Sequence, residues 1–234
     1  MQAQRIGLLV VGHVDPKSQH IAGDYPELFG SLLTPLGIDL VIYNLDEGQF
    51  PNSTKECDGW ICSPSRLSTY DDVPWLADVE ELLRRIIAEE APYVGICFGH
   101  QLLAQALGGK VEKSPAGWGV GIREFQVVQQ LRWMQPHQSR VRLIGSHQDQ
   151  VTELPGGAEL LFRSDYCHNG GFAIGTRAWT IQVHPEFIPP LADHLLAGRI
   201  GLIGAERVAQ ARASLTGPLD RKLVAQWMST FFSQ

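Results

Sequence analysis

The first half of the chain alternates between short apolar runs and longer stretches in which apolar residues recur at helical spacing. The apolar runs contain no regular polar alternation, which is typical of parallel strands covered on both faces. These predicted strands span residues 5–14, 38–45, 59–63 and 93–97. The predicted helices span residues 25–33, 73–90 and 99–109. Because strands and helices take turns, the pattern predicts an open, mostly parallel sheet with helices on both faces.

The second half of the chain shows a different hydrophobic pattern. Short β candidates follow one another at close spacing, separated by Gly, Pro and Asn, at 119–128, 141–151, 158–164, 170–176 and 178–184. Helical patterns then cover 189–200, 206–215 and 221–232. Because no repeat, linker or break in composition marks a boundary, we predict one α/β domain over residues 1–234, with an additional small antiparallel β region. Its core would span about 6–187, and C-terminal helices about 188–234.

Composition narrows the class of protein. The formal net charge of −6 over 234 residues argues against a general nucleic-acid binder, which would usually carry a basic patch. The four cysteines lack the paired short spacing of a zinc site. The N-terminal sequence does not resemble a signal peptide, and no apolar run is long enough to span a bilayer. We therefore expect a cytoplasmic protein with free thiols that binds neither nucleic acid nor membrane.

Cys97 stands at a corner between a predicted strand and a predicted helix, with Gly95 and Gly99 on either side. The arrangement resembles a nucleophile elbow, in which a sharp turn exposes a reactive side chain and small neighbours let helix and strand pack closely. A helix N-terminus favours an anion there, and the N–H of Phe98 could hold an oxyanion. The alternative is a tight turn that carries a buried structural thiol.

A second pattern follows the last predicted strand. His184 and Glu186 are two residues apart, so in extended chain they project to the same side and can approach each other. A cysteine nucleophile needs an imidazole to take its proton and a third group to orient that imidazole. Cys97, His184 and Glu186 supply all three, whereas the alternative is an ordinary His and Glu at a strand end.

Three blocks together, 95–109, 145–155 and 181–187, resemble the signature segments of the class I (triad) glutamine amidotransferases, in the family's order. The likeness is to stand-alone members similar to the amidotransferase domain of GMP synthase. It implies a flavodoxin-like fold and a reaction in which cysteine attacks the side-chain amide of glutamine. By motif position, Cys97 would be the nucleophile, His184 the base and then the acid, and Glu186 the orienting group.

The same resemblance assigns further roles. Gln101 matches a residue that contacts bound glutamine, and Ser146 and His147 match the segment that holds its α-amino and carboxylate ends. Phe98 and Ser63 would donate the two N–H groups of the oxyanion hole. The loop around Ser63 departs from the family pattern, because Cys62 replaces a glycine, and a positive φ at Cys62 would be costly. Cys62 is either a packed thiol or a redox partner of Cys97.

The function therefore stays open between three alternatives. The chain could hydrolyse glutamine and deliver ammonia to a separate synthetase subunit, act alone on a γ-glutamyl compound, or be a non-catalytic member of the fold. An apolar cluster near the C-terminus could be a docking face or could pack onto the sheet; it comprises Trp227, Met228, Phe231 and Phe232. We expect no cofactor, and we interpret His13, Asp15 and His20 as solvated polar residues rather than a metal site.

Overall fold

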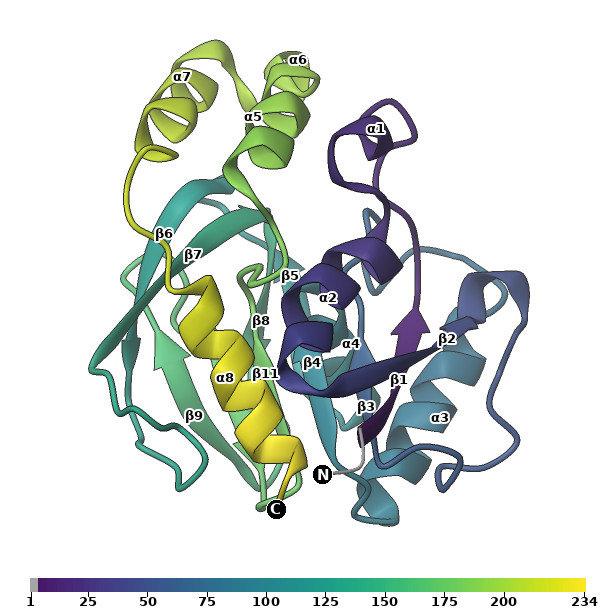
Figure 1. Ribbon diagram of the computed structural model, residues 1–234. Coiled ribbons are helices and arrows are strands. Elements are labelled where there is room, and N and C mark those ends of the chain that lie inside the picture. Colours follow the sequence, from purple (N-terminus) through teal and green to yellow (C-terminus); the bar gives the residue numbers. More distant parts are fainter. Residues whose placement is uncertain (1–3) are drawn as a thin grey trace.

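A nine-stranded mixed sheet runs through the centre of the molecule, of which the computed structural model describes residues 4–234 (Figure 1). Five neighbouring strands are parallel, in the order β2 (Ile38–Asn44), β1 (Gln4–Val10), β3 (Gly59–Cys62), β4 (Tyr93–Ile96) and β11 (Ala178–Ile181). Four antiparallel strands continue the same sheet, in the order β10 (Gly171–Ile174), β9 (Ala158–Arg163), β6 (Gly119–Val127) and β7 (Arg140–His147).

Helices cover both faces of the sheet and enclose two hydrophobic cores. One face carries α2 (Tyr25–Leu33), α5 (Pro189–Ala197), α7 (Ala205–Ser214) and α8 (Arg221–Phe232), and the other carries α3 (Leu76–Ala88) and α4 (Phe98–Ala106). Strand β1 is apolar because its side chains enter both cores: Leu8 and Val10 enter the first, whereas Leu9 and Val11, the residue after the strand, enter the second. The predicted α/β class, with a mostly parallel sheet between helical layers, is confirmed.

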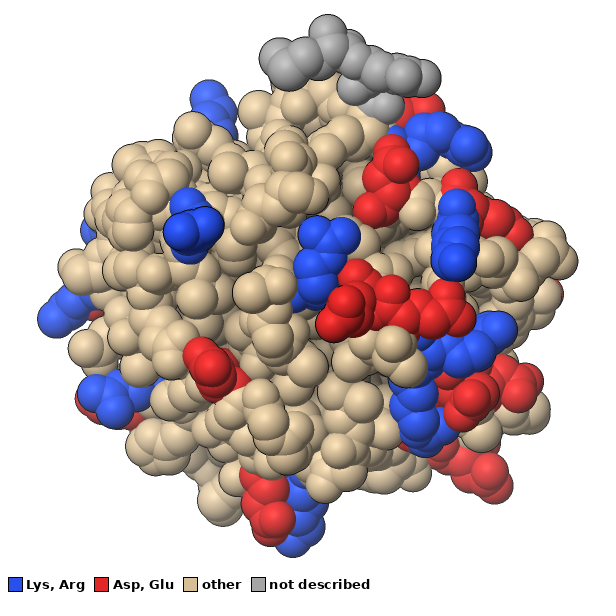
Figure 2. All heavy atoms as spheres, turned by 90° about the horizontal axis from the view of Figure 1, so that it is seen from below, with Lys and Arg blue, Asp and Glu red and all other residues tan. Residues whose placement is uncertain are grey.

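The short elements complete the chain. They are α1 (Gln19–Ala22), α6 (Ile200–Ile203), the 3-10 helices η1 (Thr34–Leu36) and η2 (Leu45–Glu47), and the two-stranded sheet of β5 (Lys110–Lys113) and β8 (Asp149–Glu153). Within residues 4–234, no helix combines the length and apolar character needed to cross a membrane. Acidic and basic side chains are interspersed on the face seen from below rather than gathered by sign (Figure 2).

The segment 141–151 departs from its predicted single strand. The chain breaks at Gln148, whose carbonyl accepts a hydrogen bond from the Ser114 amide at 3.0 Å, so that β7 stays in the large sheet and β8 joins β5. The sequence pattern could not show this division, because both halves are equally strand-like and only their partners differ. The antiparallel part is also larger than predicted, since it extends the central sheet.

The apolar C-terminal cluster packs inward, as one of the two interpretations held. Trp227, Met228, Phe231 and Phe232 are all buried on α8. Trp133 stacks on Trp179 of β11 at 4.7 Å between ring centroids, and both contact Phe231 edge-on. This aromatic layer fixes α8 across the strand that leads to His184.

Candidate active site

The turn at Cys97 joins β4 to α4 in a strained conformation. Cys97 has φ of 51°, in the left-handed region that side chains other than glycine rarely adopt, at a cost of about 1–3 kcal/mol. Its amide donates to the Ile181 carbonyl of β11 at 2.9 Å, which holds the corner against the sheet. Such strain at the corner of a strand–turn–helix unit is the geometry of a nucleophile elbow.

The two flanking glycines are required by close backbone approach. A Cβ on Gly95 would lie 2.6 Å from the Gly99 carbonyl oxygen, and one on Gly99 would lie 2.6 Å from the Cys62 carbonyl oxygen. Neither glycine has a positive φ, so the constraint is steric. The interpretation of Gly95 and Gly99 as close-packing residues is therefore supported by the structure.

His184 and Glu186 form a buried pair beside this corner. The Nδ1 of His184 and the Oε1 of Glu186 are 2.7 Å apart, with side-chain exposures of 3% and 0%. The His184 amide donates to the Ile144 carbonyl at 2.8 Å, and Phe187 stacks on the imidazole with 4.0 Å between centroids. Nε2 of His184 has no hydrogen-bond partner among residues 4–234, so this nitrogen is free for proton transfer.

Charge, rather than burial, decides the protonation of His184. Burial by itself lowers the pKa of His184, but the Glu186 carboxylate and the neighbouring Cys97 outweigh it and raise the pKa to about 10. Arg221 of α8 donates to the carbonyls of Pro185 and Glu186 at 2.8 and 3.0 Å, which fixes the backbone that carries the carboxylate. Sequence reasoning missed Arg221, because it lies far along the chain.

This pair gives a stability prediction. Because the pKa of His184 is higher in the folded than in the unfolded chain, its contribution is fully present below about pH 6.5 and is lost as the pH rises toward 10. In urea unfolding series, Glu186→Gln should show a shallower loss of stability across this window than the wild type, whose slope can reach about 1.4 kcal/mol per pH unit. His13, whose pKa is also raised, is intact in both proteins and cancels. Parallel pH profiles would contradict the assignment of Glu186 as the group that charges His184.

Cys97 and His184 open into one cavity of about 420 Å³. Three predicted substrate residues line it as well: Gln101, Ser146 and His147. The structure thus brings together one side of the elbow helix, the end of β7 and the segment after β11. The volume lies in the range of small-molecule sites in proteins.

The polar groups at the Gln101 end of the cavity are arranged as acceptors. Gln101 Nε2 donates to the Asp149 carbonyl at 2.7 Å and to Gln182 Oε1 at 3.0 Å, which leaves Oε1 of Gln101 for a ligand. Burial lowers the pKa of His147 to about 4, although the hydrogen bond between its Nδ1 and the Asp149 carbonyl opposes this. His147 is therefore neutral near pH 7. Its Nε2 is an acceptor with no partner in the described part of the chain. The Asp149 carboxylate also lines the cavity and accepts from Ser68.

Gln182 is a further polar residue that the sequence reasoning did not single out. It is fully buried, and its Nε2 donates to the Cys97 sulfur at 3.5 Å. With the Gln101 bond to its Oε1, Gln182 links the nucleophile to the substrate end of the cavity. A usable signal existed, because Gln182 and His184 are two residues apart and residues at that spacing in extended chain share a face.

One predicted oxyanion donor is free and the other is not. The Phe98 amide has no acceptor among residues 4–234. The Ser63 amide, by contrast, donates to the Leu9 carbonyl at 2.9 Å, and its hydroxyl accepts from Val11 and donates to Pro64. The assignment of Ser63 needs correction for this conformation, because the β1–β3 ladder extends one residue past Cys62 and takes up the amide.

Cys62 itself is a packed thiol. It is fully buried, its φ is not positive, and burial raises the pKa of its thiol to about 12. Its Cβ lies where a side chain on Gly99 would have to go. Cys62 therefore carries no strain from a left-handed backbone conformation. The structure favours a packed thiol over a redox partner of Cys97.

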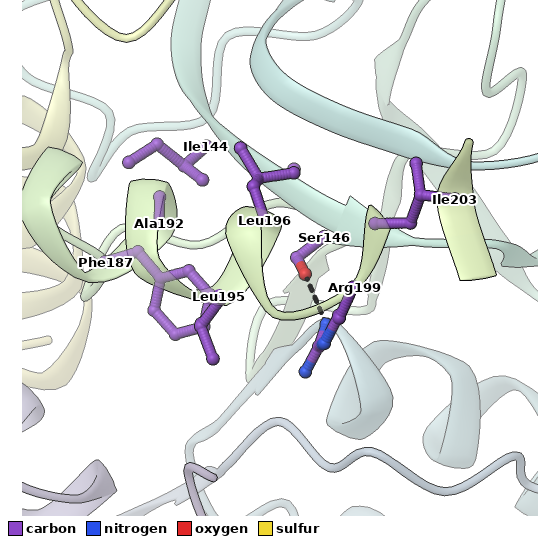
Figure 3. A pocket seen from close by; sticks show the side chains of 9 residues that line it. Ile144, Ser146, Phe187, Ala192, Leu195, Leu196, Arg199 and Ile203 are labelled. Carbon is purple, nitrogen blue, oxygen red and sulfur yellow. Dashed lines mark hydrogen bonds between the residues drawn. The ribbon is translucent and has the colours of Figure 1, made fainter. Parts of the chain in front are cut away.

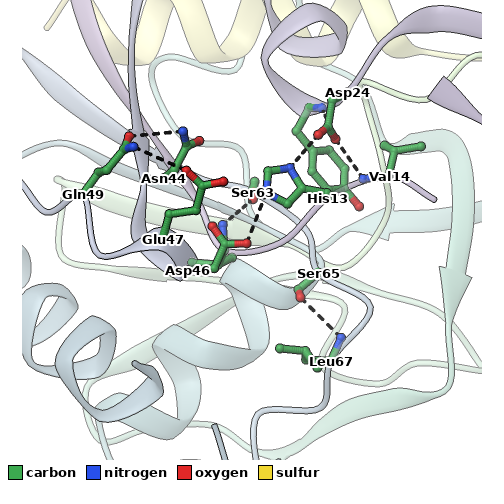
Figure 4. A network of polar contacts seen from close by, with 12 residues as sticks. His13, Val14, Asp24, Asn44, Asp46, Glu47, Gln49, Ser63, Ser65 and Leu67 are labelled. Carbon is green, nitrogen blue, oxygen red and sulfur yellow. Dashed lines mark hydrogen bonds and ion pairs between the residues drawn. The ribbon is translucent and has the colours of Figure 1, made fainter. Parts of the chain in front are cut away.

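The polar residues near the N-terminus form an ion-pair network. His13 lies between two carboxylates, with Nδ1 2.6 Å from Asp24 and Nε2 3.2 Å from Asp46 (Figure 4). His20 instead packs edge-on against His194. The Oδ2 atom of Asp15 lies 3.8 Å from Nη1 of Arg66. No group of three or more potential metal ligands occurs in residues 4–234. The network ties the loop after β1, which borders the cavity, to the start of α2.

Comparison with known proteins identifies the class. The family model for "Glutamine amidotransferase class-I" matches residues 28–199, and the chain belongs to this family. It is 30% identical over 173 residues to gamma-glutamyl peptidase 3 of Arabidopsis thaliana, covering 70% of each chain. It is also 30% identical to a glutamine-hydrolysing GMP synthase of Pyrobaculum aerophilum, covering 77% of this chain and 33% of that protein. The crystal structure of a glutamine amidotransferase from Thermotoga maritima shares the fold, with a TM-score of 0.78 at 18% identity and coverage of 100% and 97%.

Proposed function

We propose that the protein hydrolyses a γ-glutamyl amide bond through a glutamyl thioester on Cys97. The observation that carries the proposal is the opening of Cys97, on its strained elbow, and of His184, paired with Glu186, into one cavity. Strain, an unpartnered imidazole nitrogen and a buried carboxylate behind it have a common use in nucleophilic catalysis. The intact trio argues against the non-catalytic alternative.

The steps follow from the groups present. The Cys97 thiolate attacks the amide carbon, while the Phe98 amide stabilises the negative charge that develops on the oxygen. The C–N bond then breaks, and protonated His184 gives its proton to the leaving amine. His184 next takes a proton from water, which attacks the thioester and releases glutamate and the Cys97 thiolate. Glu186 orients the imidazole and stabilises its charged form throughout.

The Gln101 end of the cavity suits the glutamyl group. Its acceptors, Gln101 Oε1 and the Asp149 carboxylate, match an ammonium group, as an α-amino group is at neutral pH. Backbone amides near Ser146 and His147 would hold the α-carboxylate. Glutamine and γ-glutamyl compounds share these features, so both are candidate substrates.

Two functions remain within this chemistry. The gamma-glutamyl peptidase relatives match over about 70% of their own length, which supports a self-contained hydrolase acting on a γ-glutamyl compound. The GMP synthase relatives support a glutaminase that passes ammonia to a separate synthetase subunit. Incubation of the pure protein with glutamine and with γ-glutamyl dipeptides, followed by measurement of glutamate, separates them. Release from neither, without covalent labelling of Cys97 by a glutamine-like electrophile, would refute an enzyme that works alone.

A further inference from the structure

The cavity contains an arginine that forms no direct ion pair with an acidic side chain among the described residues 4–234. Arg199 lies between α5 and α6, and its Nη1 donates to the Ser146 hydroxyl at 3.1 Å (Figure 3). No carboxylate comes within 4.0 Å of its guanidinium in the described residues 4–234. Burial lowers the pKa of Arg199; Tyr25 and the Asp15 carboxylate partly oppose this, whereas Arg66 adds to it. A guanidinium remains charged in proteins and presents a planar fork of donors that suits a carboxylate.

Arg199 and the reacting sulfur share the same cavity. Both line it, and Cys97 is one of the neighbours that oppose the lowering of the arginine's pKa, after Tyr25 and Asp15. A half-buried cation without a counter-ion, so close to a reaction centre, is costly unless a ligand supplies the negative charge. The chemistry of the site therefore calls for an anionic group on the substrate.

The position of Arg199 indicates which part of the substrate carries that group. His184 protonates the leaving nitrogen, so the leaving amine lies on the His184 side of Cys97. The cavity wall continues from His184 through Phe187 and Leu195 to Arg199, one helical turn beyond Leu195. The acceptors that fit the α-amino group, at Gln101 and Asp149, come from α4 and β8 instead.

We propose that Arg199 binds a carboxylate of the leaving amine, and that the preferred substrates are γ-glutamyl amino acids or peptides with a free carboxylate. The inference rests on the proposed hydrolysis at Cys97. Glutamine releases ammonia and places nothing beyond the scissile nitrogen, so it leaves Arg199 unpaired. A γ-glutamyl dipeptide places a carboxylate a few bonds further on, where it replaces the missing counter-ion.

Binding to the Cys97→Ala protein tests this without turnover. Titration calorimetry with γ-glutamylalanine, its C-terminal amide and glutamine should give an affinity for the free acid about 10- to 100-fold higher than for the amide, as charge-assisted hydrogen bonds provide. Adding Arg199→Met should remove this difference and weaken glutamine binding less than binding of the free acid. The matched control is Arg132→Met, because Arg132 is exposed and lies outside the cavity.

Three results would overturn the inference. Equal affinity for acid and amide in the protein with Arg199 intact refutes it, with no need for a folded Arg199 variant. Equal weakening of glutamine and dipeptide by Arg199→Met would place Arg199 on the glutamyl carboxylate instead. Retention of the preference in Arg199→Met would assign the carboxylate to another cation.

Turnover measurements on the wild-type protein, which retains Cys97, separate this inference from the proposed function. Hydrolysis of acid, amide and glutamine at similar kcat/KM would confirm the reaction and refute the role of Arg199. A binding preference that depends on Arg199, without glutamate release from any of the three, would keep the anion site and refute the hydrolase.

Discussion

Replacing Cys97 by serine is expected to lower glutamate release from a γ-glutamyl substrate by a factor of about 10³ or more. A serine hydroxyl is a far weaker nucleophile than a thiolate, and Gln182 and His184 are arranged to stabilise a charged sulfur. The substitution changes one atom at a side chain that is only 5% exposed, so the fold should persist. The measurement is steady-state release of glutamate, with urea unfolding to verify stability.

The matched control is Cys57→Ser. Cys57 is also buried, but it lies beside Tyr43, outside the cavity. It should keep full activity and lose at most some stability, because burying a hydroxyl in place of a thiol carries a desolvation cost. If Cys97→Ser worked within tenfold of the wild type, the nucleophile would have to be another group.

Replacing Gly99 by alanine should lower both the stability and the activity of the protein. The new Cβ would lie 2.6 Å from the Cys62 carbonyl oxygen and 2.8 Å from the Cys62 Cβ, and neither can rotate away. Overpacking of this kind costs about 1–3 kcal/mol or more. Relief requires α4 to move off β3, which displaces Cys97 and the Phe98 amide, and a shift of about 1 Å can lower activity about 100-fold. Urea unfolding and kcat/KM measure the two effects.

Gly30→Ala provides the comparison for Gly99→Ala. Gly30 lies in α2, nothing occupies the space around its missing Cβ, and its φ is not positive. Alanine there should raise the free energy of unfolding by about 0.5–1 kcal/mol, because it reduces the freedom of the unfolded chain and favours the helix. Equal stability of Gly99→Ala and wild type would mean that the elbow tolerates a wider separation between α4 and β3.

Five of the residues singled out from the sequence were predicted from their spacing along the chain alone. Gly95, Cys97 and Gly99 define a turn within five residues, and His184 and Glu186 are two apart. A local pattern of this kind predicts geometry because the backbone alone decides which side chains meet. The structure places all five as these patterns indicate.

Other roles depended on contacts that no local pattern contains. Ser63 was assigned a free amide, but its partner is a carbonyl on β1, more than fifty residues earlier. Arg221 supports the backbone at Glu186 from a helix at the end of the chain. Arg199 enters the cavity from the turn between α5 and α6, where the pattern predicted an uninterrupted helix over 189–200. Each depends on how separate elements pack.

The sequence by itself determined the layers of the fold and the prediction that Cys97, His184 and Glu186 act together, because hydrophobic periodicity and short-range spacing act through the local backbone. Only the tertiary structure decided which amides stay free, where the strand 141–151 divides, and that an unpaired arginine faces the cavity of the cysteine. Hydrogen-bond pairing and charge compensation are settled between elements distant in sequence, where burial makes every unpaired group costly. The set of side chains that lines the cavity is therefore decided by tertiary packing and not by local sequence.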